Sequence, residues 1–230
     1  MTLLAHAIAA APPAPMPHDG LRGRPLAWSE SGGLGLWSTE WAPEMKLDRA
    51  DALAHHRLVE RICGAQPCLP VRFGTSFATS DEARASLDKR AAALHTALTR
   101  VAGKSELALT LLWSKGSTPP SPLPPSAPEL DGPGRRYMEA RREEFSSLET
   151  KRARAQALVD QVISELAIER PLVWHETCTS EDVAVSLAVL VPTERALERK
   201  NQLEHLGAQF ADVVPVVNGP WPPYTFAGTE

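Results

Sequence analysis

The sequence predicts an α+β protein, and three observations lead to this prediction. Strand-like runs alternate with amphipathic helical stretches along all 230 residues. Hydrophobic residues make up 43% and charged residues 23%, which is ordinary for a globular protein. A Pro/Ser-rich stretch, STPPSPLPPSAPELDGPG, interrupts the pattern near the middle and is expected to form an exposed, extended loop. We therefore predict two ferredoxin-like α+β domains, at residues 1–114 and 134–230, on either side of a Pro-rich loop at 115–133.

The first domain is expected to begin with a strand and a hairpin. Thr2–Ala9 is apolar and favours a strand over a secretory signal, because no Lys or Arg precedes Arg22. The prolines of Ala9–Gly20 then predict a loop. Leu26–Ser29 and Leu34–Thr39 are strand-like, and the SESGG segment between them supplies turn residues that tolerate positive φ.

Two helices are predicted in the first domain. Asp48 is a typical N-cap, and the first helix is expected to run to about Cys63, with Gly64 as its stop. Ser80 is expected to cap the second helix, which Gly103 ends. Apolar residues at spacings of three and four predict the buried faces. They are Leu53, Leu58, Val59 and Ile62 in the first helix, and Leu87, Ala91, Leu94, Leu98 and Val101 in the second.

A long helix, single or broken in two, is the main element predicted in the second domain, from Arg135 to about Glu169. Its mixed charges favour a solvated face, and a partner-binding face is the alternative. Glu106–Ser114 is apolar on nearly every residue, so it is expected to be a strand buried on both faces, in either domain. The other predicted elements are strands within 171–177 and 182–191, a helix from a Thr193 cap to about Phe210, and a strand at 212–217.

Charge and composition exclude several classes of function. A net charge of −4 and a pI near 6.0 argue against a nucleic-acid-binding surface, which needs a clustered basic excess. No segment approaches the ~20 apolar residues of a membrane span. Three cysteines, an odd number, indicate no disulfide framework, so a reducing cytoplasm is the expected compartment.

The sequence predicts neither a metal nor a cofactor. His55 and His56 precede Cys63 and Cys68, but this spacing matches no zinc motif. We expect one of the histidines to be exposed and Cys63 to pack in the core. No P-loop or G-x-G-x-x-G motif is present. Cys178 lies near a histidine in sequence, so a Cys-dependent enzyme is a weaker alternative to the non-enzymatic function that we predict.

Two short segments are the strongest candidates for special roles. LPVRFGTSF contains Pro70, Arg72, Phe73 and Gly74, and its alternation predicts a strand followed by a sharp turn at the glycine. We expect a mainly structural role for its arginine.

The second segment, GPWPPYTF, lies close to the C-terminal end of the sequence. Its prolines favour a preset extended tail that loses little entropy on docking, and its aromatic residues favour a docking site. The candidate partner-binding residues are Trp221, Pro222, Pro223, Tyr224 and Phe226. Packing of this tail on its own domain is the alternative.

These two segments, together with GPGRRYM at Gly132–Met138, resemble the signatures of the gas vesicle GvpL/GvpF family, in the same order and at similar separations. The resemblance covers essentially the whole chain. The first strand lacks a tyrosine that is common there, and Met138 and Asn218 replace a more usual leucine and threonine. The proline loop is an addition to the family pattern.

The resemblance implies an accessory or minor structural protein of gas vesicle formation, located at the gas vesicle within the cytoplasm. It implies binding to the hydrophobic shell protein, contacts with other gas vesicle accessory proteins, and assistance in nucleation or assembly. No nucleic-acid or membrane partner is implied. A small-ligand-binding regulatory module is the alternative that fold analogy alone would support.

Overall fold

The computed structural model describes residues 2–12, 19–42, 46–114, 133–167, 169 and 172–228. Its contacts divide the chain into two compact units. The N-terminal unit comprises Met1–Glu106, Leu190–Ala196 and Gly219–Glu230, and the C-terminal unit comprises Leu107–Val189 and Leu197–Asn218. The sequence assigned the C-terminal segment to the second domain, whereas these contacts place it in the N-terminal unit. Residues 115–132 of the predicted loop lie outside the described residues.

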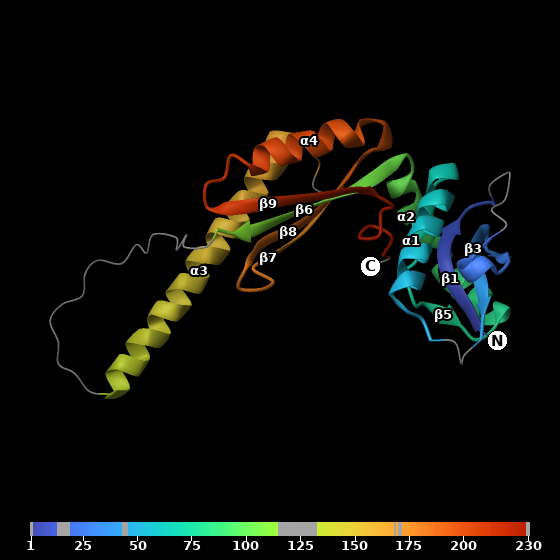
Figure 1. Ribbon diagram of the computed structural model, residues 1–230, viewed down its shortest axis with the longest axis horizontal. Helices are drawn as coiled ribbons and strands as arrows, with labels where there is room; N and C mark the ends of the chain where they lie inside the picture. The colour runs from blue at the N-terminus through green and yellow to red at the C-terminus, as the bar shows by residue number, and fades with distance from the viewer. Residues whose placement is uncertain are drawn as a thin grey trace. The chain divides into compact units, whose positions relative to one another are not determined.

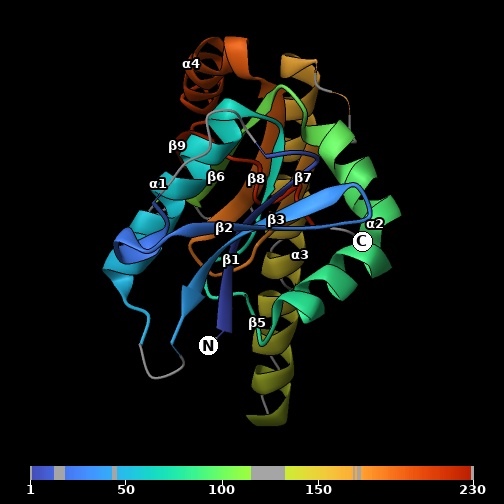
Figure 2. The ribbon, with the colours of Figure 1, turned by 90° about the vertical axis from the view of Figure 1, so that its right-hand side faces the viewer.

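The sheet of the N-terminal unit has the strand order β2-β3-β1-β4, and β5 also pairs with β1. All of these pairings are antiparallel, and Figure 2 shows β1, β2 and β3 side by side. The predicted first strand and hairpin are confirmed, and positive φ angles of 61° and 72° at Gly32 and Gly33 form the hairpin turn. The strands are β1 Thr2–Ala9, β2 Leu26–Ser31, β3 Leu34–Trp41, β4 Cys68–Pro70 and β5 Ser76–Phe77.

Helices α1 (Arg49–Ala65) and α2 (Ser80–Val101) belong to the same unit. Asp48 caps α1 as expected, but Thr79 rather than Ser80 caps α2, because the Thr79 hydroxyl accepts a hydrogen bond from the Glu82 amide. The predicted buried face of α1 is wrong at Leu53, which is 54% exposed. The core along both helices comprises Leu58, Val59 and Ile62 of α1 and Leu87, Leu94, Leu98 and Val101 of α2.

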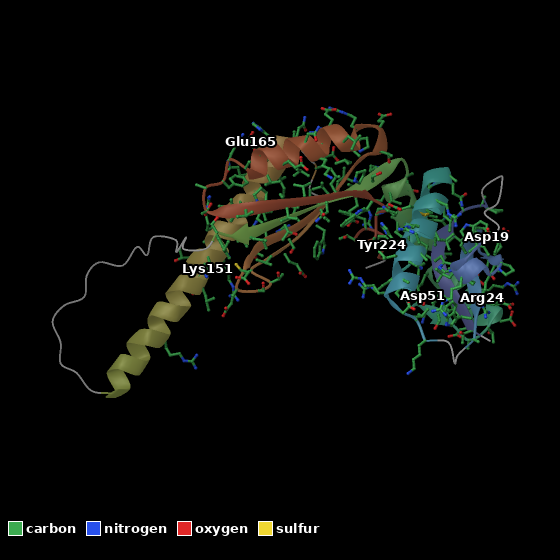
Figure 3. All side chains as sticks on the ribbon, in the orientation of Figure 1. Asp19, Arg24, Asp51, Lys151, Glu165 and Tyr224 are labelled. Atoms are coloured by element: carbon green, nitrogen blue, oxygen red, sulfur yellow. A yellow bond between two sulfur atoms is a disulfide. The ribbon has the colours of Figure 1, made fainter. Side chains whose placement is uncertain are left out.

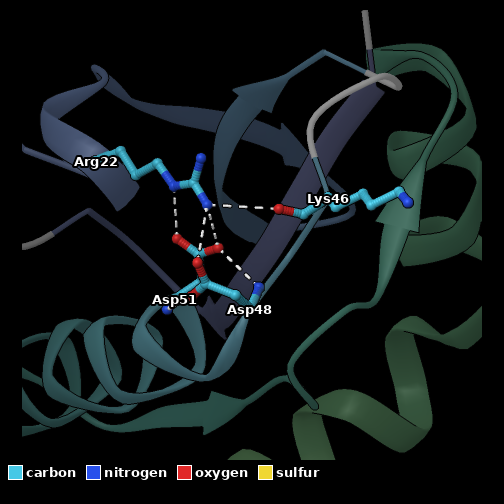
Figure 4. A network of polar contacts seen from close by, with 4 residues as sticks. All are labelled: Arg22, Lys46, Asp48 and Asp51. Atoms are coloured by element: carbon cyan, nitrogen blue, oxygen red, sulfur yellow. Dashed lines mark hydrogen bonds and ion pairs between the residues drawn. The ribbon is translucent and has the colours of Figure 1, made fainter.

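Arg22 ties the start of α1 to the segment before β2 (Figure 4). It lies in the short 3-10 turn Leu21–Gly23 and donates two hydrogen bonds to the buried carboxylate of Asp51, at 2.7 and 2.6 Å. Asp51 and Asp48 also accept from each other's backbone amides, which is a capping box. The Arg22 hydrogen bonds are the main cause of a lowered pKa at Asp51. The Arg22 guanidinium also lies 5.1 Å from the ring centre of Trp41.

Removal of either capping carboxylate is expected to destabilise α1, and Asp51 should matter more. Asp48→Ala should lower the free energy of unfolding by about 1 kcal/mol, a common N-cap cost. Asp51→Ala should lower it further, because it removes the reciprocal cap and both short hydrogen bonds from Arg22, which keeps only the longer 3.5 Å ion pair with Asp48. Urea unfolding checks this, with Asp81→Ala on the exposed start of α2 as the control. Equal stability of the Asp51 variant and the control would contradict the prediction.

The second sheet has the strand order β7-β8-β6-β9, and β7 and β8 are antiparallel. Figure 1 shows α4 and the C-terminal part of α3 beside this sheet, whereas the N-terminal part of α3 extends beyond it. The predicted α+β class is therefore confirmed, with two sheets and their helices. One long helix is observed in place of the alternative broken pair. The elements are β6 Lys104–Trp113, α3 Pro133–Leu166, β7 Val173–Thr177, β8 Val183–Pro192, the 3-10 turn Thr193–Arg195, α4 Ala196–Gly207 and β9 Val213–Trp221.

Two details of this sheet differ from the prediction. Leu107, Leu109 and Leu111 of β6 are buried, but the residues between them are only half-buried, so β6 is not buried equally on both faces. Thr193 begins a 3-10 turn and makes no side-chain cap, since α4 starts three residues later. In the part of the chain that the structure describes, no helix is both long and apolar enough to cross a membrane.

Cys63 and Cys68 form a disulfide, contrary to the sequence-based expectation. The chain reverses direction between the end of α1 and β4, and this brings the two Cα atoms to 5.2 Å, within the usual disulfide range. Both cysteines pack against the buried cluster that contains Trp37 and Ile62. The expectation failed because an odd cysteine count does not reveal a turn that pairs two of the three.

Candidate functional site

The PVRFG segment is a turn joined to β1 by backbone hydrogen bonds. The Val71 amide donates to the His6 carbonyl at 2.8 Å, and the Ala5 amide donates to the Thr75 carbonyl at 2.9 Å. Gly74 has a φ of 87°, which suits the predicted change of direction. The predicted strand alternation at Val71 and Phe73 is wrong, because β4 ends at Pro70 and a turn follows. Arg72 is exposed.

This turn encloses a buried pair of histidines. His6 of β1 and His55 of α1 are 0% and 2% exposed, and their Nδ1 atoms lie 3.0 Å apart. The Nε2 atom of His6 lies 2.8 Å from the hydroxyl of Thr39, and the Nε2 atom of His55 lies 3.0 Å from the carbonyl of Val71. Phe73 packs edge-on against the His55 ring, with centroids 5.4 Å apart. The turn thus covers the histidine pair through both backbone and side chain.

The hydrogen-bond partners determine where the protons lie. The Val71 carbonyl only accepts, so His55 carries its proton on Nε2 and accepts at Nδ1. His6 must then donate from Nδ1 and accept at Nε2 from the Thr39 hydroxyl. With both imidazoles neutral, every ring nitrogen of the pair thus has a matching partner. Burial agrees with this, because it lowers the pKa of His6 to about 3 and also lowers the pKa of His55.

The C-terminal segment packs on the N-terminal unit. Pro222, Pro223 and Phe226 are buried, and Phe226 is 5% exposed. The buried carboxylate of Glu106 accepts from the amide and the hydroxyl of Thr225, at 2.8 and 2.7 Å. Arg100 of α2 donates to the carbonyl of Phe226 at 2.6 Å. Burial raises the pKa of Glu106, although the Thr225 hydrogen bonds oppose this effect.

Two aromatic residues of the segment remain partly accessible next to α1. Trp221 is 38% exposed. Tyr224, which is labelled in Figure 3, is half-buried. His56 of α1 stacks on Tyr224 and meets Trp221 edge-on, with ring centroids 6.1 and 6.4 Å away. Glu60, one helical turn further on, pairs with His56 at 3.3 Å. Burial, followed by the Glu60 and Glu106 charges, raises the pKa of Tyr224 to about 12.

Leu53 lies three residues before His56, so both occupy one face of α1. Leu53 is largely exposed. We use the name tail–α1 surface for the residues Leu53, His56, Glu60, Trp221 and Tyr224. The structure therefore brings two of the five predicted partner-binding residues to an accessible surface, and buries the other three against their own unit.

Two shallow hollows lie in the N-terminal unit beside this surface. One, of about 350 Å³, is lined by the loop between Cys63 and Cys68, by Lys104 and by Pro223. The other, of about 180 Å³, is lined by Glu60, Trp221 and neighbouring prolines. Their linings mix a carboxylate, an ammonium group and proline rings, and this mixture defines no particular small ligand.

The suggested Cys178–His175 chemistry finds little support among the described residues. Cys178 lines a hollow of about 680 Å³ with Lys151 and Arg152, and His175 is not part of that lining. Burial raises the pKa of the Cys178 thiol despite the two cations, which disfavours the reactive thiolate. In residues 2–12, 19–42, 46–114 and the other described ranges, no group of three or more His, Cys, Asp or Glu side chains is arranged for a metal.

Several residues of the site were not singled out from the sequence. They are His6, Thr39, Arg100 and Glu106, and only the first carried a usable signal. A histidine inside an apolar strand must find a hydrogen-bond partner when it is buried. Its partner comes from α1, 49 positions away, which no local pattern reveals.

The fold is that of a gas vesicle protein. The crystal structure of gas vesicle protein GvpF from Microcystis aeruginosa matches with a TM-score of 0.73 and 18% identity, covering 99% of both chains. That of GvpF from Anabaena sp. PCC7120 matches with a TM-score of 0.74 and 21% identity, covering 100% of this chain and 97% of the other. No curated protein sequence gives a significant match.

The sequence comparison then specifies the family. The family model described as gas vesicle synthesis protein GvpL/GvpF matches residues 3–228. The chain belongs to this family.

Proposed function

We propose that this protein is an accessory or minor structural component of gas vesicle formation that binds the hydrophobic shell protein and assists nucleation or assembly. It acts at the gas vesicle within the cytoplasm and contacts other gas vesicle accessory proteins. Family membership supports the process, and the tail–α1 surface supports the binding. The proposed role requires no catalytic group or cofactor.

The observation that carries this proposal is the exposure of Trp221 and Leu53 on one surface of the N-terminal unit. Exposed apolar and aromatic side chains gathered on one surface mark interaction sites, and tryptophan and tyrosine are common hot spots of binding. The hydrogen bonds of the tail to Glu106 and Arg100 hold the segment in place before a partner arrives. A partner therefore meets a pre-organised surface, which reduces the entropic cost of association.

The strand order supports the predicted ferredoxin-like fold in one of the two units. The order β6-α3-β7-β8-α4-β9 with strand order β7-β8-β6-β9 supports a ferredoxin-like assignment for the C-terminal unit. In the N-terminal unit a hairpin precedes the first helix, and the assignment stays a prediction there.

A capture experiment tests the proposed binding. Purified shell protein is immobilised, and the Trp221→Ala/Tyr224→Ala variant is compared with wild type at pH 7.5. We expect capture to fall about tenfold or more, as loss of two aromatic hot-spot residues does. Trp174→Ala is the matched control, because Trp174 of β7 is a similarly exposed tryptophan in the C-terminal unit, at 40%. Unchanged capture by a folded double variant would exclude this surface as the binding site.

A further inference from the structure

Two adjacent histidines of α1 face opposite environments. His55 lies in the buried pair with His6, whereas His56 contacts Trp221 and Tyr224 on the tail–α1 surface. A single residue step along α1 thus joins the buried pair to the aromatic surface. A change that alters how α1 sits on β1 and on the PVRFG turn must also alter the support that His56 gives to the two aromatic rings.

The hydrogen bonds of the His6–His55 pair are disrupted when either imidazole gains an additional proton. A first proton on Nε2 of His6 places an N–H against the Thr39 hydroxyl, which already accepts from the Leu21 amide at 3.3 Å. The hydroxyl must then turn its own hydrogen elsewhere, and a charge is buried. A second proton puts N–H groups on both Nδ1 atoms, which lie 3.0 Å apart. The doubly protonated pair cannot keep its contact and must separate.

We propose that the His6–His55 pair is a proton-sensitive contact that holds α1 and the Val71–Thr75 turn on β1, and that acid opens it and disturbs the tail–α1 surface. The regulatory part of this inference rests on the proposed function of that surface. Opening exposes one or both imidazoles to water, where an imidazole binds protons at its ordinary pKa. The folded pair excludes those protons, since burial lowers the pKa of both histidines.

Among the described residues, few other charged groups face the histidine pair. Asp51 lies one turn before His55 on α1, and its carboxylate accepts two hydrogen bonds from Arg22. The charge of His56 adds to the lowering of the His55 pKa, after the effect of burial. Arg72 on the turn is exposed. Apart from His6, the sequences of β1, β4 and β5 contain no titratable residue except Cys68, which is in the disulfide. In β3, which supplies Thr39, the one titratable residue is Glu40, and it is exposed. Within the part of the chain that the structure describes, the hydrogen-bond partners of the two imidazoles thus include no carboxylate that would compensate a proton.

Amide hydrogen exchange on the full-length protein tests the inference without any partner. The reporting amides are Val71, Thr75 and Ala5, whose hydrogen bonds hold the turn. Between pH 7 and pH 5, after correction for intrinsic rates, their protection should fall about 25-fold if opening releases one imidazole, and several hundred-fold if it releases both. The Tyr224 amide, bonded to the Pro222 carbonyl, should lose protection with them.

Two reference amides make the result decisive. Ala102, at the end of α2, lies in the same unit, and Cys178, bonded to Ala184, lies in the C-terminal unit. The Cys178 amide should change much less than the turn, and the Ala102 amide should stay better protected than the turn at pH 5, because local opening costs less free energy than unfolding of the unit. Equal protection of the turn and of Ala102 at pH 5 would mean that the turn exchanges only by unfolding of the whole unit, and would overturn a local contact. An unchanged Tyr224 amide would overturn the link to the surface.

A variant and a spectrum complete the test. In His6→Phe/His55→Phe the pair is replaced by apolar rings, and protection of the turn should lose its pH dependence.

If this variant does not fold, 15N-histidine NMR of the wild-type protein decides instead. At pH 7.5 it should show protons on Nδ1 of His6 and Nε2 of His55. Titration of either imidazole near pH 6.5 with full protection of the turn would overturn the proposal. Failed capture at pH 7.5 would reject the proposed function, but it would leave this exchange result standing.

Discussion

Phe226→Ala is expected to lower the free energy of unfolding of the N-terminal unit by about 3–5 kcal/mol, the usual cost of truncating a buried phenylalanine. The ring is 5% exposed, although it lies close to the C-terminal end of the sequence. Its backbone carbonyl accepts a hydrogen bond from Arg100, and the neighbouring Thr225 amide donates a hydrogen bond to the Glu106 carboxylate. Loss of the ring would loosen these contacts and leave a buried carboxylate poorly satisfied, which adds to the cost of the cavity.

Urea unfolding checks this prediction, and Trp221→Ala is the matched comparison. Trp221 is 38% exposed, so its removal should cost only about 1–2 kcal/mol. Within this segment, Phe226 thus contributes mainly to stability, whereas Trp221 contributes mainly to the accessible surface. A loss below about 1 kcal/mol for Phe226→Ala would show that the segment does not pack on its unit as described. A larger loss for Trp221→Ala than for Phe226→Ala would also contradict this division.

Local patterns predicted most of the elements but not the contacts that join them. Thr2–Ala9 and the Gly32–Gly33 hairpin turn were predictable, because apolar runs and turn chemistry depend on neighbouring residues. The predicted buried face of α1 was wrong at Leu53, because the spacing of apolar residues alone did not show that this side chain lies away from the core. The predicted strand at Val71–Phe73 was wrong. Two backbone hydrogen bonds to β1 and one within the segment make it a turn.

The candidate site was predicted only in part for the same reason. The aromatic tail was visible in the sequence, but the burial of Phe226 depends on Glu106 and Arg100, more than 100 positions earlier. The Arg22–Asp51 pair joins residues 29 positions apart, and the His6–His55 pair joins residues 49 apart. These two contacts depend on how α1 packs against β1 and against the Leu21–Gly23 turn, which the sequence alone did not provide.

Acidification is expected to destabilise the N-terminal unit well above the pH at which carboxylates titrate. Burial lowers the pKa of His6 to about 3 and lowers that of His55, whereas both are near 6.5 in an unfolded chain. Below pH 6.5 the unfolded chain therefore binds protons that the folded chain does not. Stability is fully present above this pH and falls as the pH decreases, by up to about 1.4 kcal/mol per pH unit for each imidazole.

Two carboxylates modify this dependence at lower pH. Arg22 lowers the pKa of Asp51, so protonation of this carboxylate costs further stability only below about pH 4. Burial raises the pKa of Glu106, so its folded form binds a proton more readily than its unfolded form and partly offsets the loss. The range from pH 7.5 to pH 5 consequently isolates the histidines best.

Urea unfolding at pH 7.5, 6 and 5 measures this dependence. At pH 5 the free energy of unfolding should be lower by about 2 kcal/mol for each imidazole that stays neutral in the folded state. His6→Phe/His55→Phe should be nearly flat over the same range, while His56→Gln, which leaves the buried pair intact, should retain the wild-type slope. A flat wild-type profile would mean that the buried pair accepts protons as readily as the unfolded chain. That result would contradict the neutral hydrogen-bond network between Thr39, His6, His55 and Val71.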